Sequence, residues 1–120
     1  MADKRLKRPR SRRLTGRRIF AAVFEQGRRA SSGPLRLVAR PNGLAYSRTA
    51  LATPRSVGTA VQRNRIKRLL RESLRLLQYD LPGGYDLVIV IRPHAALKLP
   101  DYMTLIAAGM KKLHRTFTEP

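Results

Sequence analysis

The residues best suited to chemistry lie in the middle of the sequence, where residues 63–68 are RNRIKR. The guanidinium group of arginine is planar, binds phosphate through two parallel hydrogen bonds and stacks on bases. A helical pattern begins just before this segment, and the unpaired backbone N–H groups of a helix start also favour anions. Asn64 can both donate and accept hydrogen bonds, which suits a base edge or a 2′-hydroxyl. The segment therefore predicts a helix that binds nucleic-acid phosphates, with RNA as the favoured partner.

Two faces are predicted for this helix, which extends over residues 59–78. With about 100° of rotation per residue, Ile66, Leu69, Leu70, Leu74 and Leu77 fall on one side, and Lys67, Arg68, Arg71 and Arg75 fall on the other. Glu72 interrupts the positive charge and is spaced to hold Arg68 and Arg75 in place. Periodicity alone leaves open a merely solvated face. The preference for arginine over lysine favours a phosphate ligand instead.

The whole chain is strongly basic, because its 120 residues carry 26 Lys+Arg against 7 Asp+Glu, a net charge of +19. A protein this small needs polyanions to neutralise such a charge, so nucleic acid is the first class of partner. The absence of cysteine excludes disulfides and thiolate metal sites, and two histidines 20 residues apart disfavour other transition-metal sites. No stretch approaches the roughly 18 apolar residues of a membrane span. We expect a cytoplasmic protein with no membrane partner.

A basic arm followed by one folded domain is predicted. Residues 1–14 form the arm, because the mutual repulsion of their Lys and Arg side chains favours flexibility. Residues 15–120 form a single RNA-binding domain of ordinary size.

Local patterns predict a sheet covered by helices within this domain. A first helix begins after Thr15 as N-cap and stops at Gly27. Strands are expected over residues 35–40, 48–53 and 85–91, and a last helix begins at Pro100. This order of elements favours a sheet with helices over a helical bundle.

The segment over residues 57–72, VGTAVQRNRIKRLLRE, closely resembles the signature of the bacterial ribonuclease P protein subunit. Residues 13–24 are similar to the first helix of that family in Arg13-Leu14, Ile19-Phe20 and Val23-Phe24, and residues 85–91 are similar to its strand after the signature helix. The resemblance implies an α+β fold, a two-layer α/β sandwich in roughly αβββαβα order with about four strands packed by helices. It also implies a left-handed crossover, against the usual right-handed rule.

In that family the RNA subunit is the catalyst, and the small basic protein helps it to bind precursor tRNA and to release the 5′ leader by hydrolysis. The resemblance implies the same role here, in tRNA 5′ maturation, with the catalytic RNA and precursor tRNA as partners and one protein per RNA. We expect no catalytic residue in this chain, because its carboxylates are scattered and no nucleophile–base pair is evident. His94 and His114 are expected on the surface or facing RNA. We expect no cofactor on the protein, and the Mg²⁺ of the holoenzyme mainly on RNA.

Two RNA-binding surfaces follow from the family pattern. The signature helix and the basic residues before the first helix are expected to bind the catalytic RNA, through Arg63, Asn64, Arg65, Lys67, Arg68, Arg71, Arg12 and Arg13. The cleft between the first helix and the sheet is expected to hold the single-stranded leader, with Phe20, Phe24, Arg17, Arg36, Val38, Arg48 and Arg55 around it. Unpaired bases stack on such aromatic rings, and Phe24 is the one expected to lie closer to the core.

Two departures from the family pattern affect the predicted leader cleft. Val38 stands where the family often carries an aromatic residue, and Pro54 and Ser56 stand where a Ser and a Lys commonly precede the signature helix. Leader preference is therefore expected to differ within the family.

Other classes of protein fit parts of this sequence. A ribosomal protein or a nucleoid-compacting DNA protein would carry an equally basic chain with a basic arm. A protein-only nuclease would need a cluster of carboxylates for metal ions, and none is evident. Composition does not separate these classes, whereas the signature over residues 57–72 favours ribonuclease P.

Overall fold

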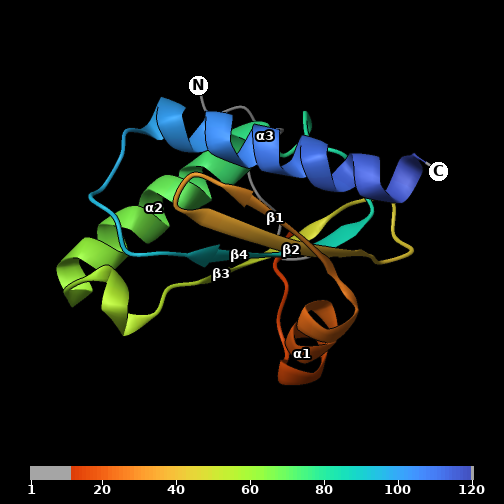
Figure 1. Ribbon diagram of the computed structural model, residues 1–120, viewed down its shortest axis with the longest axis horizontal. Helices are drawn as coiled ribbons and strands as arrows, with labels where there is room; N and C mark the ends of the chain where they lie inside the picture. The colour runs from red at the N-terminus through yellow and green to blue at the C-terminus, as the bar shows by residue number, and fades with distance from the viewer. Residues whose placement is uncertain (1–11, 120) are drawn as a thin grey trace.

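The computed structural model describes residues 12–119 and contains one mixed sheet with helices on both of its faces (Figure 1). In chain order the elements are α1 (Arg17–Gln26), β1 (Arg28–Ser32), β2 (Leu35–Pro41), β3 (Arg48–Ala52), the short 3-10 turn η3 (Arg55–Val57), α2 (Ala60–Leu77), β4 (Tyr85–Ile91) and α3 (Leu99–Thr118). The predicted α+β class, the αβββαβα order and the four strands are confirmed. The sheet and the α2–α3 layer form a two-layer sandwich, and α1 lies against the opposite face (Figure 1).

The strand order is β1-β2-β4-β3, which places β4 inside the sheet. Strand β4 pairs antiparallel with β2 and parallel with β3, so the chain crosses from β3 to β4 through α2. Val88 of β4 stands between Val38 of β2 and Ala50 of β3. A strand with neighbours on both sides and helices on both faces has no solvated face, which explains the apolar run in β4. The handedness of the crossover stays a prediction.

The larger core lies between the sheet and the α2–α3 layer. Its fully buried side chains include Leu35, Leu37, Ile66, Leu70, Leu87, Ile89, Tyr102, Ile106, Met110 and Leu113. Helix α3 packs closely on β2 at Gly109, where a Cβ atom would lie 2.8 Å from Cδ2 of Leu37. A glycine at this position therefore lets the helix approach the sheet.

A smaller core lies on the other face, beneath α1. It is formed by the buried side chains of Leu14, Val23, Val38 and Val88. Partly buried neighbours complete it, among them Ile19, Phe20, Phe24, Ala50, Ala52 and Val90. Within residues 12–119, α1 is the helix that packs on this side, against β2 and β4 (Figure 1).

Local patterns missed one strand and misplaced the start of the first helix. Strand β1 has the sequence RRASS, which lacks apolar alternation, and it is extended because all five residues pair with β2. The N-cap of α1 is Gly16 at φ 99°, not the predicted Thr15, and the Phe20 N–H donates to the Gly16 carbonyl at 3.0 Å. Glycine adopts this left-handed backbone without strain. The predicted stop at Gly27 is confirmed.

Arg13 and Leu14 belong to the fold, although the sequence assigned them to the arm. The Leu14 N–H donates to the Thr49 carbonyl at 2.9 Å, and Arg13 forms an isolated parallel bridge with Thr49 of β3. The Leu14 side chain is only 5% exposed. Residues 1–11 of the predicted arm lie outside the described part of the chain.

Candidate nucleic-acid interface

Helix α2 begins with a capping box. The Thr59 N–H donates to Oε1 of Gln62 at 2.8 Å, and the Gln62 N–H donates to Oγ1 of Thr59 at 3.2 Å. This reciprocal pair satisfies two groups that a helix start otherwise leaves unpaired. It fixes the residue at which the helix begins, and therefore the direction in which each basic side chain of the first turns leaves the helix.

The two predicted faces of α2 are confirmed. Ile66, Leu70, Ser73, Leu74 and Leu77 are buried against the sheet and α3, while Asn64, Arg65, Arg68 and Arg71 are exposed. Lys67 and Arg63 are half-buried. Ser73 is accommodated in the core because its hydroxyl donates to the Leu69 carbonyl at 2.8 Å. The basic residues of the signature are thus on the solvent side of the helix.

Arg65 is exposed on α2, and helical spacing places it on the flank away from Lys67 and Arg71. Burial raises the pKa of Tyr102 on α3, whereas the Leu97 N–H and the positive charge of Arg65 act in the opposite direction. The basic residues that follow it in α2 lie on the other flank, beside β3.

A groove of about 1030 Å³ runs beside this second flank of α2. The wall formed by α2 carries Lys67, Arg68, Arg71, Glu72 and Arg75, and the opposite wall carries Arg13, Leu14, Thr15, Phe20, Thr49, Ala50 and Leu51. We call this hollow the basic groove. It joins the signature helix to α1 and the edge of the sheet. Of the residues that the sequence predicted for the two surfaces, it brings together Arg13, Lys67, Arg68, Arg71 and Phe20.

Among residues 12–119, Glu72 is the one acidic residue that lines the basic groove, and it is paired with Arg75. Nε of Arg75 donates to Oε2 of Glu72 at 3.0 Å, and the second carboxylate oxygen accepts from Nη2. These hydrogen bonds lower the pKa of Glu72. Within residues 12–119, Arg13, Lys67, Arg68 and Arg71 form no ion pair, so their charges are available to an anion.

The two phenylalanines of α1 differ in where they point. Their ring centroids are 5.4 Å apart at an interplanar angle of 42°, and both side chains are half-buried on the smaller core. Phe20 lines the basic groove and Phe24 does not. Phe20 also lines a shallower hollow of about 390 Å³ with Gly16, Arg17 and Ala21. Phe20 is therefore the ring that a ligand in the groove can reach.

The remaining residues predicted for the leader cleft are spread over several environments. Val38 is fully buried beneath α1 and offers no surface to a ligand, which corrects its inclusion as a contact residue. Arg17 opens α1 and is exposed, and Arg36 is exposed on β2. Because strand residues alternate between faces, Arg36 lies on the same sheet face as Val38 and α1. Arg55 is exposed in η3, between β3 and α2.

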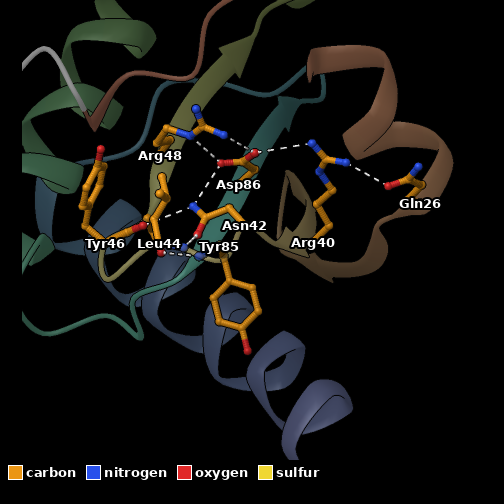
Figure 2. A network of polar contacts seen from close by, with 9 residues as sticks. Gln26, Arg40, Asn42, Leu44, Tyr46, Arg48, Tyr85 and Asp86 are labelled. Atoms are coloured by element: carbon orange, nitrogen blue, oxygen red, sulfur yellow. Dashed lines mark hydrogen bonds and ion pairs between the residues drawn. The ribbon is translucent and has the colours of Figure 1, made fainter. Parts of the chain in front are cut away.

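Arg48 belongs to a polar network centred on a buried carboxylate, Asp86 of β4 (Figure 2). Nε and Nη2 of Arg48 donate to the two oxygens of Asp86 at 2.8 and 2.7 Å, and these hydrogen bonds raise the pKa of Arg48. Nδ2 of Asn42 donates to the same carboxylate at 3.1 Å, and Nη2 of Arg40 lies 3.8 Å from it. Arg40 also donates to Gln26 of α1 at 2.8 Å. The charge of Arg48 is thus neutralised inside the protein, and its predicted phosphate contact is not available in this arrangement.

Arg12 and Arg13, predicted to bind the RNA subunit, are in different environments. The Arg13 side chain is exposed and lines the basic groove. The Arg12 guanidinium lies 5.1 Å from the ring centroid of Tyr46 and 5.8 Å from that of Tyr79, both within cation–π distance.

A family model described as Ribonuclease P matches residues 8–116. The chain belongs to the ribonuclease P protein family. The ribonuclease P protein component of Brevibacillus brevis is 39% identical over 106 residues, covering 88% of this chain and 80% of that protein. That of Methylococcus capsulatus is 49% identical over 88 residues, covering 72% and 68%. The solved RNase P protein from Thermotoga maritima has a TM-score of 0.76 at 28% identity, covering 83% of this chain and 96% of that chain.

This ribonuclease P protein is therefore one component of an endoribonuclease that acts in tRNA processing.

Both histidines lie away from the basic groove, against buried tyrosines. Nδ1 of His94 donates to the Arg92 carbonyl at 2.7 Å and its Nε2 is 2.7 Å from the Tyr102 hydroxyl, while Nδ1 of His114 is 2.8 Å from the Tyr85 hydroxyl. Over residues 12–119, no three His, Cys, Asp or Glu side chains are grouped to hold a metal ion. Nor does any helix in that range combine the length and apolarity that crossing a membrane requires.

Sequence reasoning missed the role of Asp86 in this ribonuclease P protein. Asp86 and Arg48 are 38 residues apart, and they meet only because β3 and β4 pair in parallel with these two residues in register. The signal available in the sequence was an acid at the start of an otherwise apolar strand. Since a buried carboxylate is rarely left unpaired, that position called for a basic partner among the arginines of the neighbouring strands.

Proposed function

We propose that this ribonuclease P protein binds the catalytic RNA subunit along α2 and holds the 5′ leader of precursor tRNA beside Phe20, aiding RNA-catalysed removal of the leader. The observation that carries the proposal is the basic groove, which places unpaired cations and an accessible aromatic ring in one hollow. Phosphates and unpaired bases are the two chemical groups that such a hollow accommodates together.

The contact with the catalytic RNA rests on the solvent side of α2. Arg63, Asn64, Arg65, Lys67, Arg68 and Arg71 would bind it, with Arg13 adding a cation from the opposite wall of the groove and Arg12 supporting it from the aromatic pair. Contacts of this kind release counterions from the RNA, so binding should weaken steeply as salt is raised.

The contact with the leader rests on Phe20, with phosphate contacts from Arg17, Arg36 and Arg55. A base stacked on Phe20 would contribute about 1 to 3 kcal/mol. Phe24 and Val38 would support this ring from the core, and Arg48 would act through Asp86 by keeping the sheet face in place. Because leader bases would meet one ring rather than a row of them, we expect little dependence on leader sequence.

The hydrolytic step is assigned to the RNA subunit. Two carboxylates are committed to other partners, because that of Asp86 is bonded to Arg48 and Asn42 and that of Glu72 to Arg75, and no three His, Cys, Asp or Glu side chains of residues 12–119 are grouped to hold a metal ion. Mg²⁺ prefers carboxylates that are free to share it with phosphate and water. We therefore expect the magnesium ions to be held mainly by RNA phosphates, with one cytoplasmic protein per RNA lowering the repulsion between RNA and substrate.

Reconstitution tests the proposal directly. Bacterial ribonuclease P RNA is mixed with precursor tRNA at low magnesium, with and without this chain, and release of the 5′ leader is followed on a gel. We expect cleavage to be much faster with the chain present than with the RNA alone. Equal rates with and without the chain, using a matched RNA, would overturn the proposal.

A further inference from the structure

Tyr79, just beyond the end of α2, is an aromatic residue that the proposed function leaves without a role. Its side chain is 59% exposed. Every other tyrosine and phenylalanine within residues 12–119 is buried or half-buried. A ring held in water has a face available for stacking, and stacking on bases is what exposed aromatic residues contribute to single-stranded RNA binding.

The position of Tyr79 continues the basic side of α2. Gln78, the C-cap, keeps helical backbone angles of φ −56° and ψ −27°, so Tyr79 stands where the next residue of the helix would be. It follows Arg71 by eight residues and Arg75 by four. Residues four apart are neighbours on a helix surface. The ring therefore ends a ridge whose other members line the basic groove.

Arg12 holds the Tyr79 ring from one side. Its guanidinium lies over both Tyr79 and Tyr46, which links the end of α2 to the loop before β3 and to the start of the described chain. A cation over a ring restrains it and adds positive charge beside it. An apolar protein partner would gain little from the positive charge around this ring. A nucleotide whose base stacks on the ring would place its negative phosphate beside that charge.

We propose that Tyr79 is a stacking site for an unpaired base of the catalytic RNA, whose phosphates would follow Arg68 and Arg71 along α2. The inference rests on the proposed function. It extends the RNA contact beyond the basic groove to the C-terminal end of α2. Arg12 is a positioning residue at this site, because it acts through the ring.

Binding of the full chain to a single-stranded RNA 12-mer that contains 2-aminopurine tests this site, since stacking on a ring quenches the fluorescence of that base. Tyr79→Leu keeps an apolar side chain and removes the ring, and Tyr79→Phe keeps the ring and removes the hydroxyl. We expect Tyr79→Leu to weaken binding roughly fivefold or more and to lose part of the quenching, which is the cost of one lost base stack. Tyr79→Phe should bind and quench as the unsubstituted chain does.

Controls separate this inference from the proposed function. Phe117→Leu removes the α3 ring whose centroid lies 4.6 Å from the guanidinium of Arg28 in β1, and it should leave RNA binding unchanged. If the unsubstituted chain binds and Arg68→Ala weakens it, but Tyr79→Leu binds and quenches normally, the stacking site is wrong and the proposed function stands. If the unsubstituted chain does not bind the 12-mer at all, the stacking site is wrong, and the cleavage assay decides the proposed function separately. A loss in Tyr79→Phe equal to that in Tyr79→Leu would also overturn the stacking site.

Discussion

The two faces of the sheet are built differently. The face toward α2 and α3 is sealed by a continuous apolar core, whereas the face toward α1 carries a small core, a buried carboxylate network and the wall of the basic groove. Stability is concentrated where side chains are apolar and fully enclosed. The second face can therefore carry charged and half-buried residues that a ligand reaches, because the first face holds the fold together.

The largest expected effect is on the sealed face. Ile106→Ala removes a fully buried side chain from the contact between α3 and the sheet. We expect it to lower the free energy of unfolding by about 2 to 5 kcal/mol, from the lost burial and the cavity left behind. Urea unfolding followed by circular dichroism measures this. A loss no larger than that of Phe24→Ala on the other face would mean that stability is shared equally between the faces.

A smaller loss of stability is expected from the carboxylate network on the α1 face. Asp86→Ala leaves Arg48 and Arg40 beside an empty site, and we expect a loss of about 2 to 3 kcal/mol, below the range for a fully buried pair because the Arg48 side chain is 25% exposed. The matched control is Arg48→Met combined with Asp86→Leu, which removes both charges. Thermal unfolding should show the double variant to be more stable than Asp86→Ala. A double variant no more stable would mean that the pair itself, and not the stranded arginine, sets the cost.

Removing the Phe20 ring should affect the binding of precursor tRNA more than the stability of the fold. Phe20→Ala should weaken the affinity of the reconstituted holoenzyme for precursor tRNA by about 1 to 3 kcal/mol, and change that for mature tRNA much less, because only the precursor has a leader to stack. Phe24→Ala is the comparison, since its ring supports Phe20 but does not line the groove, and it should weaken precursor binding less than Phe20→Ala. Equal losses for both tRNAs, or a large fall in melting temperature, would place Phe20 in the structural core instead.

The smallest effects should come from single charges on the groove wall, and they should have opposite signs. Arg68→Ala should lower the salt slope of RNA binding by about one unit, as expected for one lost phosphate contact. Glu72→Gln frees Arg75 from its carboxylate partner and should tighten binding and steepen the slope. Titrations at several salt concentrations measure both. Slopes that do not change in either variant would mean that this face is merely solvated.

The parts of the fold that the sequence predicted are those set by local periodicity. The helical spacing of Ile66, Leu70 and Leu74 divided α2 into the two faces that the structure contains, and residues 85–91, apolar except for Asp86, matched β4 without error. Strand β1 escaped prediction because its residues have no apolar alternation. It is extended because β2 pairs with it, a tertiary cause that propensity does not register.

The candidate site was less predictable, since it depends on residues brought together by strand pairing. The two walls of the groove come from residues 13–20, 49–51 and 67–75, and no local pattern indicates that these segments share one hollow. Arg48 was predicted to meet phosphate because its type and strand position fit that role. Its partner Asp86 became visible only once the register of β3 against β4 was known.

The pairing of Arg13 and Leu14 with Thr49 protects the free edge of β3. An exposed strand edge is a template for pairing with another chain and for aggregation. Here the start of the described chain covers part of that edge and buries Leu14 in the smaller core. A truncation that removes the basic arm must therefore end before Arg12. Cutting at residue 14 would uncover a sheet edge, and an aggregated product would then be mistaken for a loss of RNA affinity.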